Sequence, residues 1–112
     1  IENGITKMIP YFHTVGPDTT STYTQSNNIV DLTWSGASGT HTFIMPPASE
    51  IPYRVIRITN NSTVTANDKV DVTAAAGDTI DGVAYYRLNK PYNGVAIWSD
   101  GTNWTVIQAK ST

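Results

Sequence analysis

The apolar residues of this chain come in short runs, and each run ends at a pair or cluster of turn-forming residues. Leucine, a strong helix former, occurs only at Leu32 and Leu88, whereas Thr, Val and other strand-favouring residues are frequent. Gly, Pro, Asn and Asp favour the backbone angles of turns and leave little room between them for a helix of ordinary length. The chain is therefore expected to fold almost entirely as β-structure. The turn clusters are Gly16-Pro17-Asp18, Ser35-Gly36-Ala37-Ser38-Gly39, Pro46-Pro47, Asn60-Asn61, Asp81-Gly82, Asn93-Gly94 and Asp100-Gly101.

The stretches between the turns have the length and composition of β-strands. Short strands at this spacing favour a single antiparallel β-sandwich or jelly-roll-like domain. The sequence shows no internal repeat of fixed period. The expected strands are Ile5–His13, Tyr23–Trp34, Thr40–Met45, Tyr53–Thr59, Val70–Ala74, Val83–Leu88, Gly94–Trp98 and Asn103–Ala109.

Alternation along these strands predicts which side chains form the core, because neighbouring side chains on a strand point to opposite faces. The opposite faces carry Tyr53, Val55 and Arg57 on one strand, Tyr85 and Arg87 on another, and Trp98 on a third. This second set is aromatic and basic, which an inert surface does not require. The pairs expected in the core are Phe43 with Met45, Ile56 with Ile58, Tyr86 with Leu88, Val95 with Ile97, and Trp104 with Val106.

The length of 112 residues fits one domain. Residues 1–22 are less regular, so we expect them to be an N-terminal connector from an upstream shaft, and residues 23–112 to form the sandwich. Because the first residue is Ile1 and not methionine, we expect the chain to be a fragment of a longer protein. A domain this small buries only about two thirds of its unfolded surface, so association with other copies would help to stabilise it.

Composition and charge exclude several classes of protein. The chain has no cysteine, so it has no disulfides and no Cys-ligated zinc. The formal net charge is −2, and the seven basic residues are scattered and form no stripe, so we do not expect nucleic-acid binding. No apolar run is long enough to cross a membrane, and the first residues, Ile1-Glu2-Asn3-Gly4, do not have the pattern of a signal peptide, so we expect no membrane insertion.

Candidate catalytic and metal-ligating groups are few. His13 and His41 lack metal-ligand spacing, and we expect them to be ordinary surface histidines. The acidic residues Asp68, Asp71, Asp78 and Asp81 do not follow the spacing of a calcium loop, and nothing near them favours a glycosidase pair. We expect them to be solvated loop carboxylates. No nucleophile with its base and no phosphate-binding loop is present, so we expect no enzymatic activity, no metal and no cofactor.

Aromatic residues are the remaining signal, with three tryptophans and six tyrosines. Flat rings stack on sugars, but they also fill cores and subunit interfaces, so both roles stay open for Trp34, Tyr53, Tyr85, Tyr92 and Trp98.

Four segments carry a resemblance to a known family. They are Thr42–Ser49 (TFIMPPAS), Tyr53–Asn60 (YRVIRITN), Gly77–Gly82 (GDTIDG) and Ser99–Trp104 (SDGTNW). In this order they resemble the C-terminal β-domains of bacteriophage tail fibres and tailspikes, and the resemblance covers roughly Leu32 to Ala109. The matching positions set turns and fill the core, so they identify a fold more than a ligand.

The resemblance implies a homotrimeric virion protein at the distal tip of the tail fibre, made in the host cytoplasm, that contacts bacterial surface glycan, either lipopolysaccharide or capsule. The leading hypothesis is a host-recognition module. Its expected ligand-binding residues are Trp98, Tyr85, Tyr53, Arg57 and Arg87, the rings stacking on sugars and the arginines pairing with acidic groups. The alternative is a non-binding domain that trimerises and caps the fibre or tailspike, in which the same Tyr and Arg side chains lie between subunits.

Overall fold

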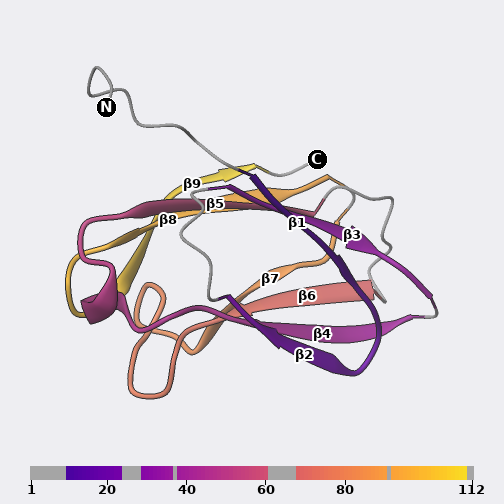
Figure 1. Cartoon of the computed structure of the whole chain (residues 1–112), viewed down its shortest axis with the longest axis horizontal. Coiled ribbons are helices and arrows are strands. Elements are labelled where there is room, and N and C mark those ends of the chain that lie inside the picture. The colour runs from indigo at the N-terminus through magenta and orange to yellow at the C-terminus, as the bar shows by residue number, and fades with distance from the viewer. Residues whose placement is uncertain (1–9, 24–28, 37, 61–67, 91, 111–112) are drawn as a thin grey trace.

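The computed structural model describes residues 10–23, 29–36, 38–60, 68–90 and 92–110, which fold into nine strands in two facing sheets (Figure 1). Sheet A has the strand order β1-β3-β5-β8-β9, and sheet B has the order β2-β4-β6-β7. The expected all-β fold is confirmed. The strands are β1 (Pro10–Val15), β2 (Thr19–Thr22), β3 (Ile29–Trp34), β4 (Gly39–Ile44), β5 (Val55–Asn60), β6 (Asp68–Thr73), β7 (Tyr85–Leu88), β8 (Gly94–Ser99) and β9 (Trp104–Lys110).

The chain winds between the two sheets from β1 to β6. Odd strands enter sheet A and even strands enter sheet B, so β1, β3 and β5 are paired in parallel, as are β2, β4 and β6. Three strands then follow in antiparallel pairings: β7 on β6, β8 on β5, and β9 on β8. The described chain is thus a short parallel coil whose last turn is covered by antiparallel strands.

The expected antiparallel arrangement is therefore wrong for four of the seven pairings. Consecutive strands at the start of the chain lie in different sheets, so the turn clusters between them change sheets and do not close hairpins. Parallel neighbours then meet only after the chain has passed through the other sheet. Alternating hydrophobicity fixes the faces of a strand but carries no information about its direction.

The core lies between the sheets and contains the residues that alternation predicts. Eight of the ten expected core residues are buried, and Tyr86 and Val106 pack partly buried against them. A single cluster links residues from both sheets, because each strand directs every second side chain inward. The buried members of the expected pairs are Phe43, Met45, Ile56, Ile58, Leu88, Val95, Ile97 and Trp104.

The N-terminal strands differ from the expected connector. Residues 10–15 and 19–22 add a strand to each sheet, and the side chains of Val15 and Tyr23 are only 3% and 1% exposed. Residues 19–22 escaped prediction because all four are Thr or Ser, so no apolar alternation marks the strand. The expected connector and strand over residues 1–9 lie outside the described residues, as does the part of the expected strand Tyr23–Trp34 at residues 24–28.

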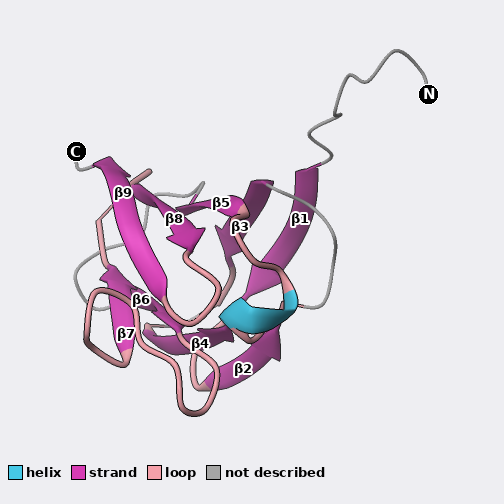
Figure 2. Cartoon of the chain, turned by 90° about the vertical axis from the view of Figure 1, so that its left-hand side faces the viewer, coloured by secondary structure: helices cyan, strands magenta, loops and turns pink. Residues whose placement is uncertain are grey.

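One end of the sandwich is closed by a short 3-10 helix, η2 (Ala48–Glu50), between β4 and β5 (Figure 2). The backbone N–H of Ala48 donates to Oδ2 of Asp78 at 2.9 Å, and the Ser99 hydroxyl donates to the carbonyl of Ala48 at 2.7 Å. These two bonds tie η2 to the segment after β6 and to the end of β8. Within the described residues, no helix is long and apolar enough to span a membrane.

Candidate ligand-binding surface

The outward side chains of sheet A form rows across β5, β8 and β9, which the pairing register defines. Val55 lies opposite Trp98, and Arg57 lies opposite Ala96, which in turn lies opposite Gln108. The inward neighbours on the same strands are core residues, so these rows face away from sheet B. Two of the sequence-predicted ligand residues, Arg57 and Trp98, therefore share one surface.

Tyr53 joins this surface at its edge. Its ring centroid lies 6.3 Å from that of Trp98, with 34° between the ring planes, and 70% of Tyr53 is exposed. Two protein rings at this distance make a contact, and the open side of an exposed ring can meet the face of a sugar. We refer to Tyr53 and Trp98 below as the aromatic pair.

Tyr53 was expected in a strand, but β5 begins only at Val55, and Tyr53 has a φ of 66°. Its backbone N–H donates to the carbonyl of Ser99 at 2.8 Å, which anchors the turn to the end of β8. A side chain at Gly101, which has a φ of 93°, would lie 3.8 Å from the Tyr53 hydroxyl. The tyrosine is therefore held in an unfavourable left-handed backbone conformation, and its ring remains open to solvent.

A groove lies beside the aromatic pair on the same face of sheet A. Nη1 of Arg57 on β5 donates to Oε1 of Gln108 on β9 at 3.0 Å, so two long side chains from the strands on either side of β8 meet across Ala96. The groove has a volume of about 260 Å³, and Gly94 and Ala96 form its floor. A Cβ at Gly94 would lie 2.9 Å from the carbonyl oxygen of Ile58, so this floor cannot carry a side chain without a backbone shift. The complete lining is Arg57, Thr59, Gly94, Val95, Ala96 and Gln108.

Most of this groove was not predicted from the sequence. The sequence predicts a turn at Asn93-Gly94 and gives no role to Thr59, Ala96 or Gln108. The sequence gives only a weak indication of a groove. Alternation places Gly94, Ala96 and Trp98 on one face of a strand, so that two small residues precede a large ring on that face. Only the pairing register shows that Arg57 and Gln108 flank the small residues.

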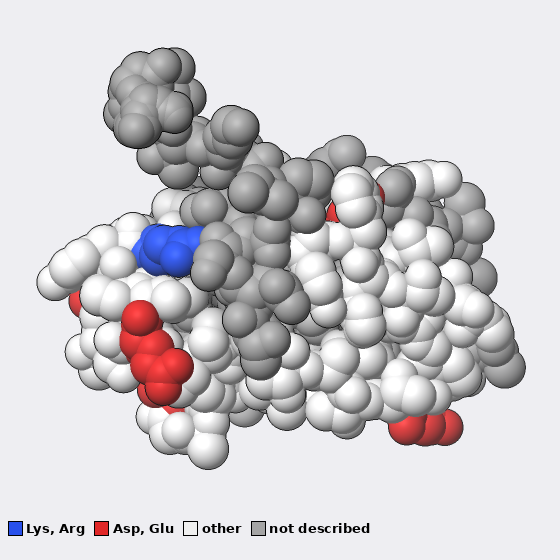
Figure 3. All heavy atoms as spheres, viewed as in Figure 1, with Lys and Arg blue, Asp and Glu red and all other residues white. Residues whose placement is uncertain are grey.

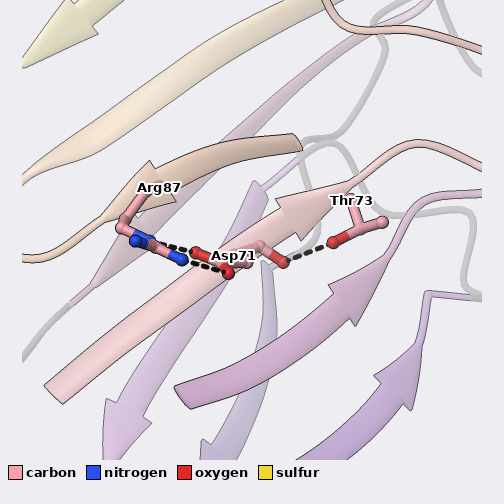
Figure 4. Close-up of polar contacts among 3 residues, drawn as sticks. All are labelled: Asp71, Thr73 and Arg87. Carbon is pink, nitrogen blue, oxygen red and sulfur yellow. Dashed lines mark hydrogen bonds and ion pairs between the residues drawn. The ribbon is translucent and has the colours of Figure 1, made fainter. Parts of the chain in front are cut away.

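Tyr85 and Arg87 lie on the other side of the molecule, on the outer face of sheet B. Nε and Nη2 of Arg87 donate to the two carboxylate oxygens of Asp71 at 2.8 and 3.0 Å (Figure 4). The guanidinium also lies 5.2 Å from the centroid of the Tyr85 ring. The hydrogen bond to Asp71 is the main cause of the raised pKa of Arg87. The five expected ligand residues are thus divided between two opposite faces, and Arg87 already has an anionic partner.

The four acidic residues do not gather into one site. Asp71 was expected in a solvated loop, but it is a buried residue of β6, because Arg87 covers it. Asp78 accepts from the backbone N–H of Ala48, and Asp81 accepts from the backbone N–H of Val106 at 3.0 Å. The side chain of Asp68 lies outside the described residues. Within the described part of the chain, no group of three or more His, Asp or Glu side chains is arranged to hold a metal ion.

His41 is not the surface residue that we expected, since it is only 2% exposed. Its Nδ1 lies 2.7 Å from the Thr19 hydroxyl and its Nε2 lies 2.8 Å from the Ser21 hydroxyl, so it fastens β2 to β4. The Thr19 hydroxyl donates to the carbonyl of Gly16, which assigns the His41 proton to Nδ1 and leaves Nε2 to accept from Ser21. Burial, and then the nearby His13, lower the pKa of His41.

Trp34 and Tyr92, the two other aromatic residues for which the sequence leaves both roles open, differ in their exposure. Trp34 is partly buried and packs against the core, whereas Tyr92 is 43% exposed in the turn before β8 and has a φ of 56°. Neither side chain is adjacent to the aromatic pair in the pairing register.

A second cavity, of about 560 Å³, lies at the end of the sandwich where β2 and β4 finish. Its walls are mostly apolar, and Tyr23, Met45, Pro47 and Ile51 are among them, with Glu50 and Arg54 also in the lining. In the sequence, Pro46-Pro47 indicates a turn and nothing more, so this cavity was not predicted.

Among the described residues on the face shown in Figure 3, few are charged. A comparison with models of known protein families finds no match to this chain, and a comparison with curated proteins finds none either.

Proposed function

We propose that this chain is a host-recognition module of a bacteriophage tail fibre, which binds bacterial surface polysaccharide as a homotrimer. The observation that supports binding is the aromatic pair, an exposed ring on a strained turn next to a second ring at 6.3 Å. A strained backbone that positions an exposed side chain is more often found at functional sites than on inert surfaces.

The affinity of each site is expected to be low. An exposed tyrosine beside a half-buried tryptophan, stacking on one or two sugar rings, fits a millimolar site, about 4 kcal/mol of binding free energy. Three copies held in one trimer act on a repetitive polysaccharide through effective concentration, which raises the avidity by about 100-fold or more without new contacts. Weak sites therefore suit a trimer that meets a repeating surface.

Assembly and binding are assigned to different sheets in this proposal. The outer face of sheet B carries Thr20, Thr42 and Thr73, and its Arg87 charge is balanced by Asp71. Such a face costs less to remove from water than one with unpaired charges. Subunit contacts through sheet B would leave the aromatic pair on sheet A open to the ligand.

The experiment combines light scattering with binding of the 112-residue chain to an array of bacterial lipopolysaccharides and capsular polysaccharides. We expect a mass close to three times 12.2 kDa, and binding that Tyr53→Ala and Trp98→Ala each reduce at least tenfold while the mass stays unchanged. Tyr92→Ala is the matched control, because Tyr92 is also an exposed tyrosine with a positive φ. If Tyr53→Ala and Trp98→Ala bind the glycan as tightly as Tyr92→Ala and the parent chain do, the aromatic pair is excluded as the site.

A second candidate, a structural cap of the fibre or tailspike, is favoured by the strand topology. The last turn of the parallel coil, β5 and β6, is covered by the antiparallel strands β8 and β7. At the other end of the coil, β1 pairs with β3 only and β2 with β4 only among the described strands. A repeat stack is closed in this way by its terminal units. Dissociation of the trimer by Tyr85→Ala, with no glycan bound by the parent chain, would support the cap.

A further inference from the structure

The charge of Arg57 is available on the surface of sheet A. Its one hydrogen-bond partner among the described residues is the neutral amide of Gln108, and no described carboxylate forms a salt bridge with it. A guanidinium has five N–H donors, and among the described residues only one of those on Arg57 has a partner, which leaves the others to meet a ligand. Arg87 differs in that both carboxylate oxygens of Asp71 already occupy it.

The size of the groove restricts what the free charge can meet. A volume of about 260 Å³ lies below the range of about 300–1,000 Å³ that is typical of sites for drug-sized ligands. It suits a single sugar unit rather than an oligosaccharide. Gly94 and Ala96 keep the floor flat, while Thr59, Arg57 and Gln108 offer hydroxyl, guanidinium and amide groups at the walls.

The groove and the aromatic pair are aligned along one strand. Gly94 and Trp98 are four residues apart on β8 and both face outward, which corresponds to a distance of about 13 Å. Arg57 lies between them, opposite Ala96. A short stretch of one glycan chain can therefore reach from the rings to the groove and pass the guanidinium.

From this alignment we infer that the groove over Gly94 and Ala96 is a subsite for an anionic sugar unit, whose carboxylate or phosphate pairs with Arg57. This inference rests on the proposed glycan-binding function and adds a ligand class to it. Arginine suits the role because its planar fork of donors matches the oxygens of both anions. The polysaccharide recognised would accordingly be acidic.

The test uses trigalacturonic acid, its carboxyl-reduced counterpart and glucose 6-phosphate as probes, with backbone and side-chain NMR shifts of the whole chain as the readout. We expect the acidic trisaccharide to move the signals of Gly94, Ala96 and the Gln108 amide, and to bind about tenfold more tightly than the reduced form. Stronger shifts with glucose 6-phosphate than with the uronate would assign the subsite to phosphate.

Gln108→Glu is the decisive variant, because it keeps the size of the side chain and supplies Arg57 with an internal carboxylate. It should abolish the preference for the acidic probe and leave binding of the reduced probe unchanged. Gln108→Met removes the amide without adding charge, and it should retain the preference. Lack of preference in the parent chain, with shifts confined to Tyr53 and Trp98, would overturn the anionic subsite and leave the proposed function intact.

The same NMR experiment also distinguishes failure of the aromatic pair from failure of the anionic subsite. Shifts at Gly94 and Gln108 that survive Trp98→Ala and Tyr53→Ala undiminished would support the anionic subsite and contradict the role of the aromatic pair. If neither anionic probe moves Gly94 or Gln108 at tens of millimolar, the subsite is excluded. Because opposite exposed charges are screened by salt, the preference should also shrink between about 20 and 500 mM salt, on the order of tenfold or less.

Discussion

Arg87 on β7 and Asp71 on β6 occupy directly opposed positions of an antiparallel pair and are joined by two hydrogen bonds of 2.8 and 3.0 Å (Figure 4). The backbone carbonyl of Asp71 also accepts from the Thr73 hydroxyl at 3.0 Å. The carboxylate is 11% exposed, whereas the arginine side chain is 40% exposed. The ion pair therefore shields a carboxylate that would otherwise be largely buried without a charged partner.

Because the Asp71 side chain is much less exposed than that of Arg87, we expect Arg87→Ala to destabilise the protein more than Asp71→Asn does. In the single chain, the first change leaves a largely buried charge unpaired, which costs about 1–3 kcal/mol, and the second leaves an arginine that is 40% exposed and can be solvated by water. Urea denaturation of both variants is measured at concentrations where the chain is monomeric, because subunit contacts through sheet B would cover Arg87. Equal stabilities would show that Asp71 is solvated in solution, and a loss of glycan binding by Arg87→Ala at full stability would return Arg87 to the ligand site.

Arg57 and Arg87 show how much of the surface was predictable from the sequence. Both stand between apolar residues in short strands, and alternation correctly placed both on outward faces. Their different roles depend on what lies opposite them: Asp71 across from Arg87, and Ala96 across from Arg57. These pairings join residues far apart in the chain, and no local pattern reports them.

The fold was predictable to a similar depth. Core membership follows from an alternation of period two, which depends only on the strand itself, so the expected pairs such as Ile56 with Ile58 are buried. The parallel coil was not predictable in this way, because it depends on which sheet each strand joins. Strand β2 was also missed, since its attachment comes from hydroxyl groups that bond to His41 and not from apolar side chains.

The His41 contacts predict that stability decreases in mild acid. Burial lowers the pKa of His41 in the folded state below its unfolded value of 6.5, so the unfolded chain binds the proton more readily. The stabilisation is fully present above pH 6.5 and is lost as the pH falls from 6.5 through the folded pKa. Thermal unfolding followed by circular dichroism between about pH 7.5 and 5 should show a falling Tm.

His13→Gln serves as the control for this titration. His13 lies 6.4 Å from His41, ring centroid to ring centroid, and its charge contributes to the lowered pKa. The variant should therefore show a weaker decrease of Tm over the same pH range. A steeper decrease, or a parent Tm that is constant across the range, would contradict the assignment of the acid sensitivity to His41.

Gly94→Ala should destabilise the protein by about 1–3 kcal/mol, because the new Cβ would lie 2.9 Å from the Ile58 carbonyl oxygen and would push β8 away from β5. Gly77→Ala should destabilise the protein for a different reason. Gly77 has a φ of 90°, and an added Cβ would have no neighbouring atom within 4 Å, so this change strains only the backbone. Amide hydrogen exchange separates the two effects: Gly94→Ala should raise exchange along β5 and β8, and Gly77→Ala should not.

Tyr53 offers the sharpest test of whether strain is retained for binding. Its φ of 66° favours glycine by about 1 kcal/mol over a residue with a side chain, and 70% of the tyrosine is exposed, so its ring adds little packing beyond the contact with Trp98. Tyr53→Gly should therefore be about 1 kcal/mol more stable than Tyr53→Ala in urea denaturation, and both should lose glycan binding to the same extent.

If glycine is no more stable than alanine, the turn relaxes when the ring is removed, and Tyr53 itself is then the cause of the left-handed backbone. If glycine is more stable and binding is lost, the fold holds an unfavourable tyrosine at a cost in stability, as expected for a residue kept to contact a ligand.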